Sequence, residues 1–315
     1  MRQAFAQRAH WEPGSRCRGP AQPAFPPEGG RGYNEVSMNT SACEACGNQF
    51  SLSMEQCPHC GHTGPAPNVK AAGLPEETKA LDRRYRAALK AADGRGCRAA
   101  VDAFAAALAG SQAVINCRVE EVDRLASSDR NFYASYYERL HGGVHGPYDD
   151  AWDLLRKVAD VTLFTHYEDK IHFAALSLDG IGVRSYGACS LVLREPMIAS
   201  RTSVFEGNSA GLLGKRQRLR PGFRALWADR MKLGVAKLAA QVGAGTEPVQ
   251  FPALLLFQGG TPEEDRFVEV HIWGSLSIRT CERVILLSEP RKTRQVQVKA
   301  LRLKLAAMGV ALEKV

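Results

Sequence analysis

No apolar run in this 315-residue sequence approaches the roughly 20 residues that a membrane-spanning helix needs. The N-terminus lacks the basic, apolar and small-residue regions of a secretory signal peptide. The sequence also contains no GxxxxGKS/T, GxGxxG or HExxH motif, the signatures of common nucleotide-binding and metalloprotease sites. We therefore expect a cytoplasmic protein without a membrane span, whose function has to be inferred from other features.

Residues 1–37 have little regular hydrophobic pattern. They are rich in Pro, Gly and Arg and contain no run that would build a core, which predicts disorder. Met38 directly precedes the first organised segment. A translation start at Met38, with residues 1–37 as a spurious extension, is therefore an alternative hypothesis to a start at Met1.

The cysteines do not have the close, even spacing of a small disulfide-rich protein. Five of the nine are scattered and lie mostly in apolar surroundings, which predicts reduced, structural thiols. These five are Cys17, Cys97, Cys117, Cys189 and Cys281.

The other four cysteines form two Cys-x2-Cys pairs, separated by ten residues. They are Cys43, Cys46, Cys57 and Cys60. Each pair is followed by a glycine, Gly47 or Gly61, which can adopt the positive φ that folds the chain beneath a metal. Four soft thiolates fit a structural, tetrahedral Zn²⁺ site. Residues 38–62 therefore resemble the zinc ribbon family, which implies a metal-stabilised fold but no particular activity.

The rest of the chain shows no internal repeat and divides by its hydrophobic pattern. Residues 63–74 contain two prolines and no periodicity, which indicates a linker. Residues 75–160 have the apolar spacing of helices, and residues 161–315 contain short apolar or alternating runs typical of strands. The predicted fold class is α+β: a small zinc ribbon, a helical middle region, and a mixed, mainly antiparallel sheet domain with flanking helices.

Local spacing also predicts individual elements. Helices are expected after Pro75 and over residues 97–110, about 221–242 and about 292–308. One further helix is predicted to face the core through Tyr148, Trp152, Leu155 and Val158. Strands are predicted over residues 172–178, 187–195, 202–206, 249–259, 267–278 and 283–288.

The net charge of +8 is concentrated in two places. Residues 201–240 contain nine Lys or Arg against two acids, and residues 291–304 contain six Lys or Arg and no acid. Such segments attract phosphate groups, although a solvated helix face has the same composition. The basic segments 212–224 and 291–304 are therefore candidates for contact with nucleic acid or protein.

The run RFVEVHIWG, residues 266–274, alternates as a strand does. One face carries Val268, Val270 and Ile272 and reads as core. The opposite face carries Phe267, Glu269, His271 and Trp273. That second face is either the lining of a cleft or an ordinary solvent face, with Glu269 and His271 as a solvated edge or a salt-bridged pair.

Three polar segments of the strand-rich half together resemble the ADP-ribosyltransferase fold, whose members transfer ADP-ribose from NAD. They are FTHYEDKIH (164–172), YGACSLVLREPMIASRTSVFEGNS (186–209) and FVEVHIWG (267–274). The resemblance covers about residues 163–288. It implies that NAD is a substrate, with a protein or nucleic acid as the acceptor.

The resemblance also implies roles for single residues. Glu269 would stabilise the positive charge that develops on the ribose as the nicotinamide bond breaks. His166, Arg201 and Ser203 complete the predicted catalytic set. The predicted NAD contacts are Tyr186, Thr202, Ser209 and Trp273. Arginine-modifying members have Glu or Gln two residues before the catalytic glutamate, whereas this chain has Phe267, so an arginine acceptor is not expected.

Other interpretations remain open. The chain can instead be a non-enzymatic zinc-ribbon adaptor that binds nucleic acid or protein through its basic segments. His166 can be a structural histidine, and the Ser, Thr and Asn residues can serve turns. A hydrolase using Glu269 and His271 would lack the clustered acids of a metal-dependent site. The sequence gives neither the acceptor nor the oligomeric state.

Overall fold

The structure, a computed structural model, describes residues 40–51, 54–141, 151–214, 219–259, 261, 264–287 and 295–315. These residues all belong to one unit, Asn39–Val315. The predicted disordered segment 1–37 and the alternative start Met38 lie outside the described residues. So do parts of both basic segments, residues 215–218 and 291–294.

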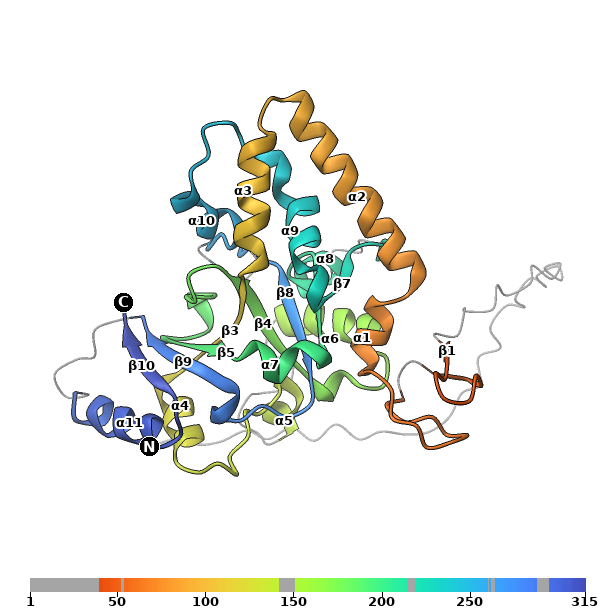
Figure 1. Cartoon of the computed structure of the whole chain (residues 1–315). Helices are drawn as coiled ribbons and strands as arrows, with labels where there is room; N and C mark the ends of the chain where they lie inside the picture. The colour runs from red at the N-terminus through yellow and green to blue at the C-terminus, as the bar shows by residue number, and fades with distance from the viewer. Residues whose placement is uncertain are drawn as a thin grey trace, which may run out of the picture. The chain divides into compact units, whose positions relative to one another are not determined.

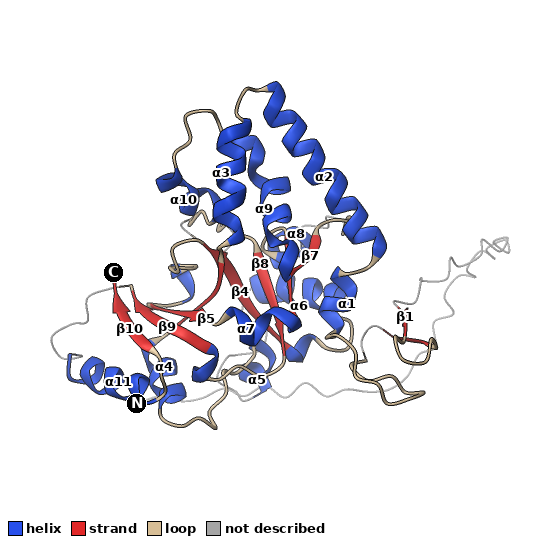
Figure 2. Ribbon diagram, viewed as in Figure 1, coloured by secondary structure: helices blue, strands red, loops and turns tan. Residues whose placement is uncertain are grey.

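An eight-stranded sheet forms the centre of the described fold (Figures 1 and 2). Its strand order is β10-β9-β5-β3-β4-β8-β6-β7. Neighbouring strands are antiparallel except β9 and β10, which are parallel. The strands are β3 (Gln112–Cys117), β4 (Ile171–Ser177), β5 (Cys189–Leu193), β6 (Thr202–Phe205), β7 (Arg224–Leu226), β8 (Glu269–Trp273), β9 (Cys281–Leu286) and β10 (Ala311–Lys314). The predicted α+β class with a mixed, mainly antiparallel sheet is confirmed.

Helices surround this sheet. They are α1 (Pro67–Ala72), α2 (Pro75–Gly94), α3 (Arg98–Ala109), α4 (Val119–Ala126), α5 (Tyr136–His141), α6 (Ala151–Leu163), α7 (Glu195–Ile198), α8 (Ser209–Gly214), α9 (Arg230–Leu238), α10 (Phe251–Leu255) and α11 (Gln295–Ala307). Proline opens both α1 and α2, where its fixed φ suits the first turn and its missing N–H costs no hydrogen bond. The short strands β1 (Thr40–Ala42) and β2 (Gln49–Ser51) form a separate antiparallel hairpin.

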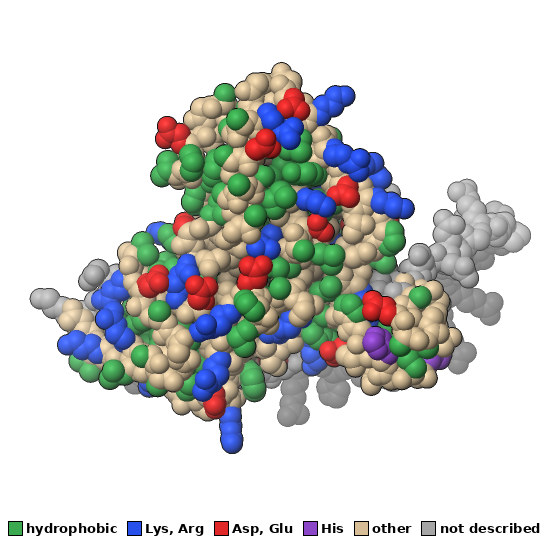
Figure 3. Space-filling model, in the orientation of Figure 1, with side chains coloured by type: hydrophobic (Ala, Val, Ile, Leu, Met, Phe, Trp, Pro, Cys, Tyr) green, Lys and Arg blue, Asp and Glu red, His purple; other side chains and the backbone are tan. Residues whose placement is uncertain are grey.

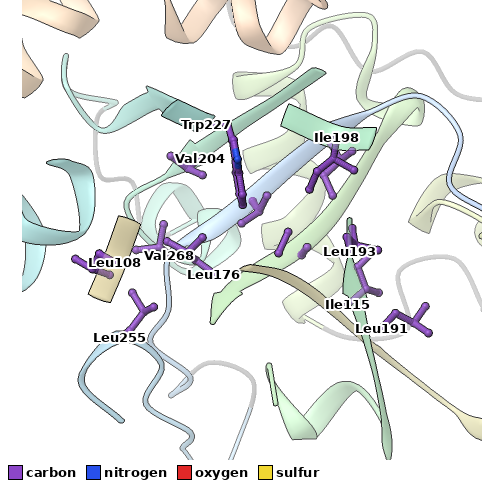
Figure 4. Packing of buried hydrophobic residues seen from close by; sticks show 14 of the residues in the cluster. Leu108, Ile115, Leu176, Leu191, Leu193, Ile198, Val204, Trp227, Leu255 and Val268 are labelled. Atoms are coloured by element: carbon purple, nitrogen blue, oxygen red, sulfur yellow. The ribbon is translucent and has the colours of Figure 1, made fainter. Parts of the chain in front are cut away.

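Helices α2, α3 and α9 share the main hydrophobic core with one face of the sheet (Figure 1). This core includes Leu108 of α3, Leu233 of α9 and Val204 of β6, and each is fully buried. Figure 4 shows part of this cluster, including Val268 and Trp227. Val268, Val270 and Ile272 also belong to this core, so the predicted apolar face of RFVEVHIWG is confirmed.

The opposite face of β8 is covered as well. Ala159 and Leu163 of α6 and Leu213 of α8 pack with Phe205 of β6 in a second buried cluster. Glu269 and His271 point to this side and are buried. The expectation that this face lines a cleft or meets solvent is wrong, because Arg156 of α6 and the Ser209 backbone of α8 contact Glu269 there. The expected pairing of Glu269 with His271 is present, at 3.1 Å.

Three predicted elements are also wrong. Residues 112–117, inside the predicted helical region 75–160, form β3 near the middle of the sheet. The predicted helix over 221–242 begins with strand β7 and becomes α9 only at Arg230. The predicted strand over 249–259 contains helix α10.

The prediction of which α6 residues face the core is wrong at one position. Val158, predicted to face the core, is 52% exposed together with Leu154 at 57%. None of the described helices has the length and apolar character required to cross a bilayer.

Candidate functional site

The four cysteines of the N-terminal hairpin region converge on one point. The sulfur atoms of Cys43, Cys46, Cys57 and Cys60 all lie within 4.8 Å of one another. Cys43 Sγ is 3.6 Å from Cys60 Sγ, and Cys46 Sγ is 3.8 Å from Cys57 Sγ. A tetrahedral ion with metal–sulfur bonds of about 2.3 Å sets its ligands about 3.8 Å apart. The cluster can therefore hold a metal ion such as zinc, as predicted for a zinc ribbon.

Two equivalent turns present these sulfurs. Gly47 and Gly61 have φ angles of 73° and 74°, which a side chain would strain. Their backbone N–H groups donate to the carbonyl oxygens of Cys43 and Cys57 at 2.8 and 2.9 Å. The backbone N–H of Asn48 lowers the pKa of Cys46 to about 7. This turn therefore favours the thiolate form that binds a metal.

Helix α1 attaches the cysteine cluster to the rest of the fold. Lys70 Nζ donates to the carbonyl oxygen of Met54 at 2.8 Å and lies 4.5 Å from the ring centroid of Phe50. Phe50 packs with Cys43 and Cys57 in a small buried cluster. The Lys70 ammonium thus lies beside a centre that four thiolates would make negative.

Asn68, also in α1, connects the same helix to the sheet and is 2% exposed. Its Nδ2 donates to the carbonyl oxygen of His271 at 2.9 Å and to Ser203 Oγ at 3.1 Å. These atoms belong to β8 and β6 respectively. The short helix α1 therefore contacts both the zinc ribbon segment and the sheet.

Glu269 lies in a closed hydrogen-bond network between α6, α8 and β8. Its carboxylate accepts from Arg156 Nη2 at 2.9 Å, from the backbone N–H of Ser209 at 3.0 Å and from His271 Nε2 at 3.1 Å. The side chains of Glu269 and His271 are each 1% exposed. Three donors thus engage the two carboxylate oxygens, away from solvent.

Arg156 connects Glu269 to a second acid. Its Nη1 donates to Ser209 Oγ at 3.0 Å and lies 3.5 Å from Asp160 Oδ1. The hydroxyl of Tyr137 donates to Asp160 Oδ2 at 3.0 Å. The guanidinium also lies 4.3 Å from the ring centroid of Phe173. Arg156 is therefore the central cation of a buried network.

Burial and charge oppose each other within this network. Burial raises the pKa of Glu269, but the Arg156 charge and the hydrogen bond from His271 outweigh it and lower that pKa to about 2. Burial raises the pKa of Asp160 to about 7, because Arg156 offsets only part of its desolvation. Burial also lowers the pKa of His271, so its neutral ring donates Nε2–H to Glu269.

Three predicted residues lie together where β6 begins beside the end of β8, and they bond to the backbone and to Asn68. They are Arg201, Thr202 and Ser203. Arg201 donates from Nη1 to the carbonyl oxygen of Trp273 and from Nε to that of Met197 at 3.1 Å. Thr202 Oγ1 donates to the carbonyl oxygen of Ile198 at 2.7 Å. These contacts clamp strand ends, which is a structural role.

The remaining predicted residues lie in three different environments. His166 is exposed in the turn after α6, with a φ of 71°. Tyr186 is 44% exposed in a short 3₁₀ helix, within electrostatic range of Arg156. Trp273 is half-buried with its ring 5.5 Å from that of Tyr167. Among the described residues, no hydrogen bond joins His166 to Glu269, Arg201 or Ser203. Of the predicted set, the structure thus brings Ser209 to Glu269.

Sequence reasoning did not identify Arg156, Asp160, Tyr137 or Asn68. A signal was present for two of them, because Arg156 and Asp160 lie one turn apart on the same helix side as Ala159 and Leu163. A charged pair on the apolar side of a helix indicates a buried partner of opposite charge.

No protein-family model matches this chain, and no curated protein sequence matches it. The site therefore has to be interpreted from its own geometry. The cysteine cluster can coordinate a metal, whereas the Glu269 network holds α6 and α8 against β8.

Proposed function

We propose that this protein is a non-enzymatic zinc-ribbon adaptor, which binds a macromolecular partner and does not turn over NAD. The observation that carries the proposal is the enclosure of Glu269 by Arg156, His271 and the Ser209 backbone. A carboxylate that stabilises a ribosyl cation has to face the substrate. At 1% exposure and with three donors, Glu269 has no oxygen directed at a cleft.

The cysteine cluster supports the adaptor part of the proposal. Four thiolates and no open ligand position fit a structural zinc, which folds a small module and does not activate water. Lys70 and Asn68 then fix that module to the sheet through α1. Zinc would thus hold the ribbon in one orientation relative to β6 and β8.

A nicotinamide-release assay tests the proposal. The purified full-length protein, shown to carry about one zinc per chain, is incubated with NAD in the presence and absence of cell lysate. We expect no nicotinamide above the buffer background and no labelled acceptor from adenine-labelled NAD. Release by the wild-type protein that disappears in a folded Glu269→Gln variant would overturn the proposal and favour an ADP-ribosyltransferase.

A further inference from the structure

Helix α2 carries four cations on one side. Lys79, Arg83, Arg86 and Lys90 follow the spacing i, i+4, i+7, i+11, which places them in one stripe along the helix. All four side chains are exposed. Figure 3 shows Lys and Arg side chains along the outer side of α2. With a rise of 1.5 Å per residue, this basic stripe is about 16 Å long.

The basic stripe differs from two other cations around α2, which form ion pairs. Arg84 forms an ion pair with Glu206, and Lys232 of α9 forms one with Asp82 at 2.9 Å. No ion pair is formed by any of the four stripe residues with another described residue, although the charge of Arg86 helps to lower the pKa of Asp82 one turn away. Their like charges repel one another at i, i+3 and i, i+4 spacing, which disfavours the free protein. A bound polyanion would remove this repulsion.

We propose that the basic stripe of α2 binds the phosphate backbone of nucleic acid. The inference rests on the proposed function, because it identifies the adaptor's partner. Phosphates of one duplex strand advance about 3.4 Å each along the axis, so the stripe can face roughly five of them. Lys and Arg contacts of this kind give affinity without reading sequence.

The surroundings of the stripe favour nucleic acid over two other anionic partners. A membrane-binding helix needs apolar side chains to insert between lipids. The apolar side of α2, including Leu81 and Tyr85, instead packs on the main core. No large hydrophobic residue of α2 is exposed. A protein interface would also need an apolar or aromatic centre, which the stripe lacks.

Salt-dependent binding to a labelled duplex tests the inference. The full-length protein is titrated into fluorescent duplex DNA of about 20 base pairs, long enough for the whole stripe. Four phosphate contacts at about 0.9 each predict a slope near −3.6 in log affinity against log salt. Affinity should then fall roughly 100-fold between about 50 and 200 mM salt. The variant K79Q/R83Q/R86Q/K90Q should lose most of the affinity and most of this slope.

The matched control removes the same charge at other exposed positions. R118Q/R130Q/K170Q/K314Q also replaces two exposed Lys and two exposed Arg, and all four lie outside α2 and outside the basic segments 212–224 and 291–304. This control should keep the wild-type slope. Equal losses in both variants, or no duplex binding by the wild-type protein, would overturn the inference. So would binding to phosphatidylserine vesicles with no binding to the duplex.

The outcome is independent of the NAD assay. Duplex binding that is unchanged in K79Q/R83Q/R86Q/K90Q would reject the α2 site but not the adaptor proposal. NAD turnover that depends on Glu269 would reject the adaptor proposal itself, whatever the duplex result.

Discussion

The Arg156 guanidinium donates to the Glu269 carboxylate at 2.9 Å, and both side chains are almost entirely withdrawn from solvent. The two residues are 113 positions apart in the sequence, so the pair fixes α6 against β8. Arg156→Met would leave the Glu269 charge buried without its main partner. We expect the free energy of unfolding to fall by about 3–5 kcal/mol, measured by urea denaturation.

The double variant Arg156→Met/Glu269→Met separates the buried charge from the loss of packing. Because it removes both charges, it should be more stable than Arg156→Met alone. Additive losses from the two single substitutions would show that the two side chains act independently, contrary to the network described here.

Asp160 should make the folded protein less stable as the pH rises from about 4 to about 7. Its pKa is raised to about 7 in the folded protein, against about 3.9 in an unfolded chain. Its contribution to stability is therefore complete below pH 4 and is lost as the pH rises through 7. In that window the wild-type protein should lose up to roughly 1.4 kcal/mol per pH unit relative to Asp160→Asn.

This pH effect is measured as the difference in free energy of unfolding between the two proteins from pH 4 to 8. Glu269 provides a contrast, because its pKa is lowered to about 2. Its contribution is present above pH 4.3 and is lost as the pH falls toward 2. A constant difference between wild type and Asp160→Asn would contradict the assigned state of Asp160.

Zinc removal should affect the ribbon before the sheet. Cys57→Ser removes one of four ligands, so bound zinc measured by elemental analysis should fall from about one per chain to near zero. Hydrogen exchange should accelerate in β1 and β2 while β4 and β8 stay protected. Cys97→Ala is the control, since Cys97 is buried at the start of α3, away from the cluster. Full zinc in Cys57→Ser would contradict the assigned ligands.

The basic stripe of α2 should reduce the stability of the free protein. Its three neighbouring like-charge pairs each cost about 0.2–0.5 kcal/mol, and the attraction of Arg86 to Asp82 offsets one of them, so K79Q/R83Q/R86Q/K90Q should be more stable by about 0.5–1 kcal/mol. Glutamine has nearly the helix propensity of Lys and Arg, so the backbone contribution stays similar. Thermal unfolding at low salt measures the gain, and added salt should reduce it. A loss of stability would indicate that these cations make stabilising contacts.

The sequence predicted well those features that depend on local spacing. The two Cys-x2-Cys pairs, with a glycine after each, define the metal cluster within about twenty residues. The apolar spacing of α2, α3 and α11 and the alternation of β8 are likewise contained in single segments. Each pattern is visible without knowing what the segment packs against.

The failures occurred where a distant partner decides the structure. Gln112–Cys117 is a short run between helices, and it becomes a strand because β4 and β5 pair with it. The apolar run around Phe251–Leu255 fits a buried helix or strand equally well. Arg156 and Asp160 lie on the apolar side of α6, which indicates a buried partner, but the helix alone does not identify that partner as Glu269, 113 residues away from Arg156. Alternation separates the two faces of RFVEVHIWG, but it does not show which face is exposed. Both are buried, one in the main core and the other beneath α6 and α8.

The position of β3 also constrains the order in which the chain can fold. The strand is made early in synthesis, yet its hydrogen-bonding neighbours β4 and β5 follow only after α4, α5 and α6. Until those strands emerge from the ribosome, the edges of β3 have no native partner. Such long-range pairing slows folding and prolongs exposure of apolar strands. A nascent chain stalled before residue 171 would therefore depend on chaperones more than its helical content suggests.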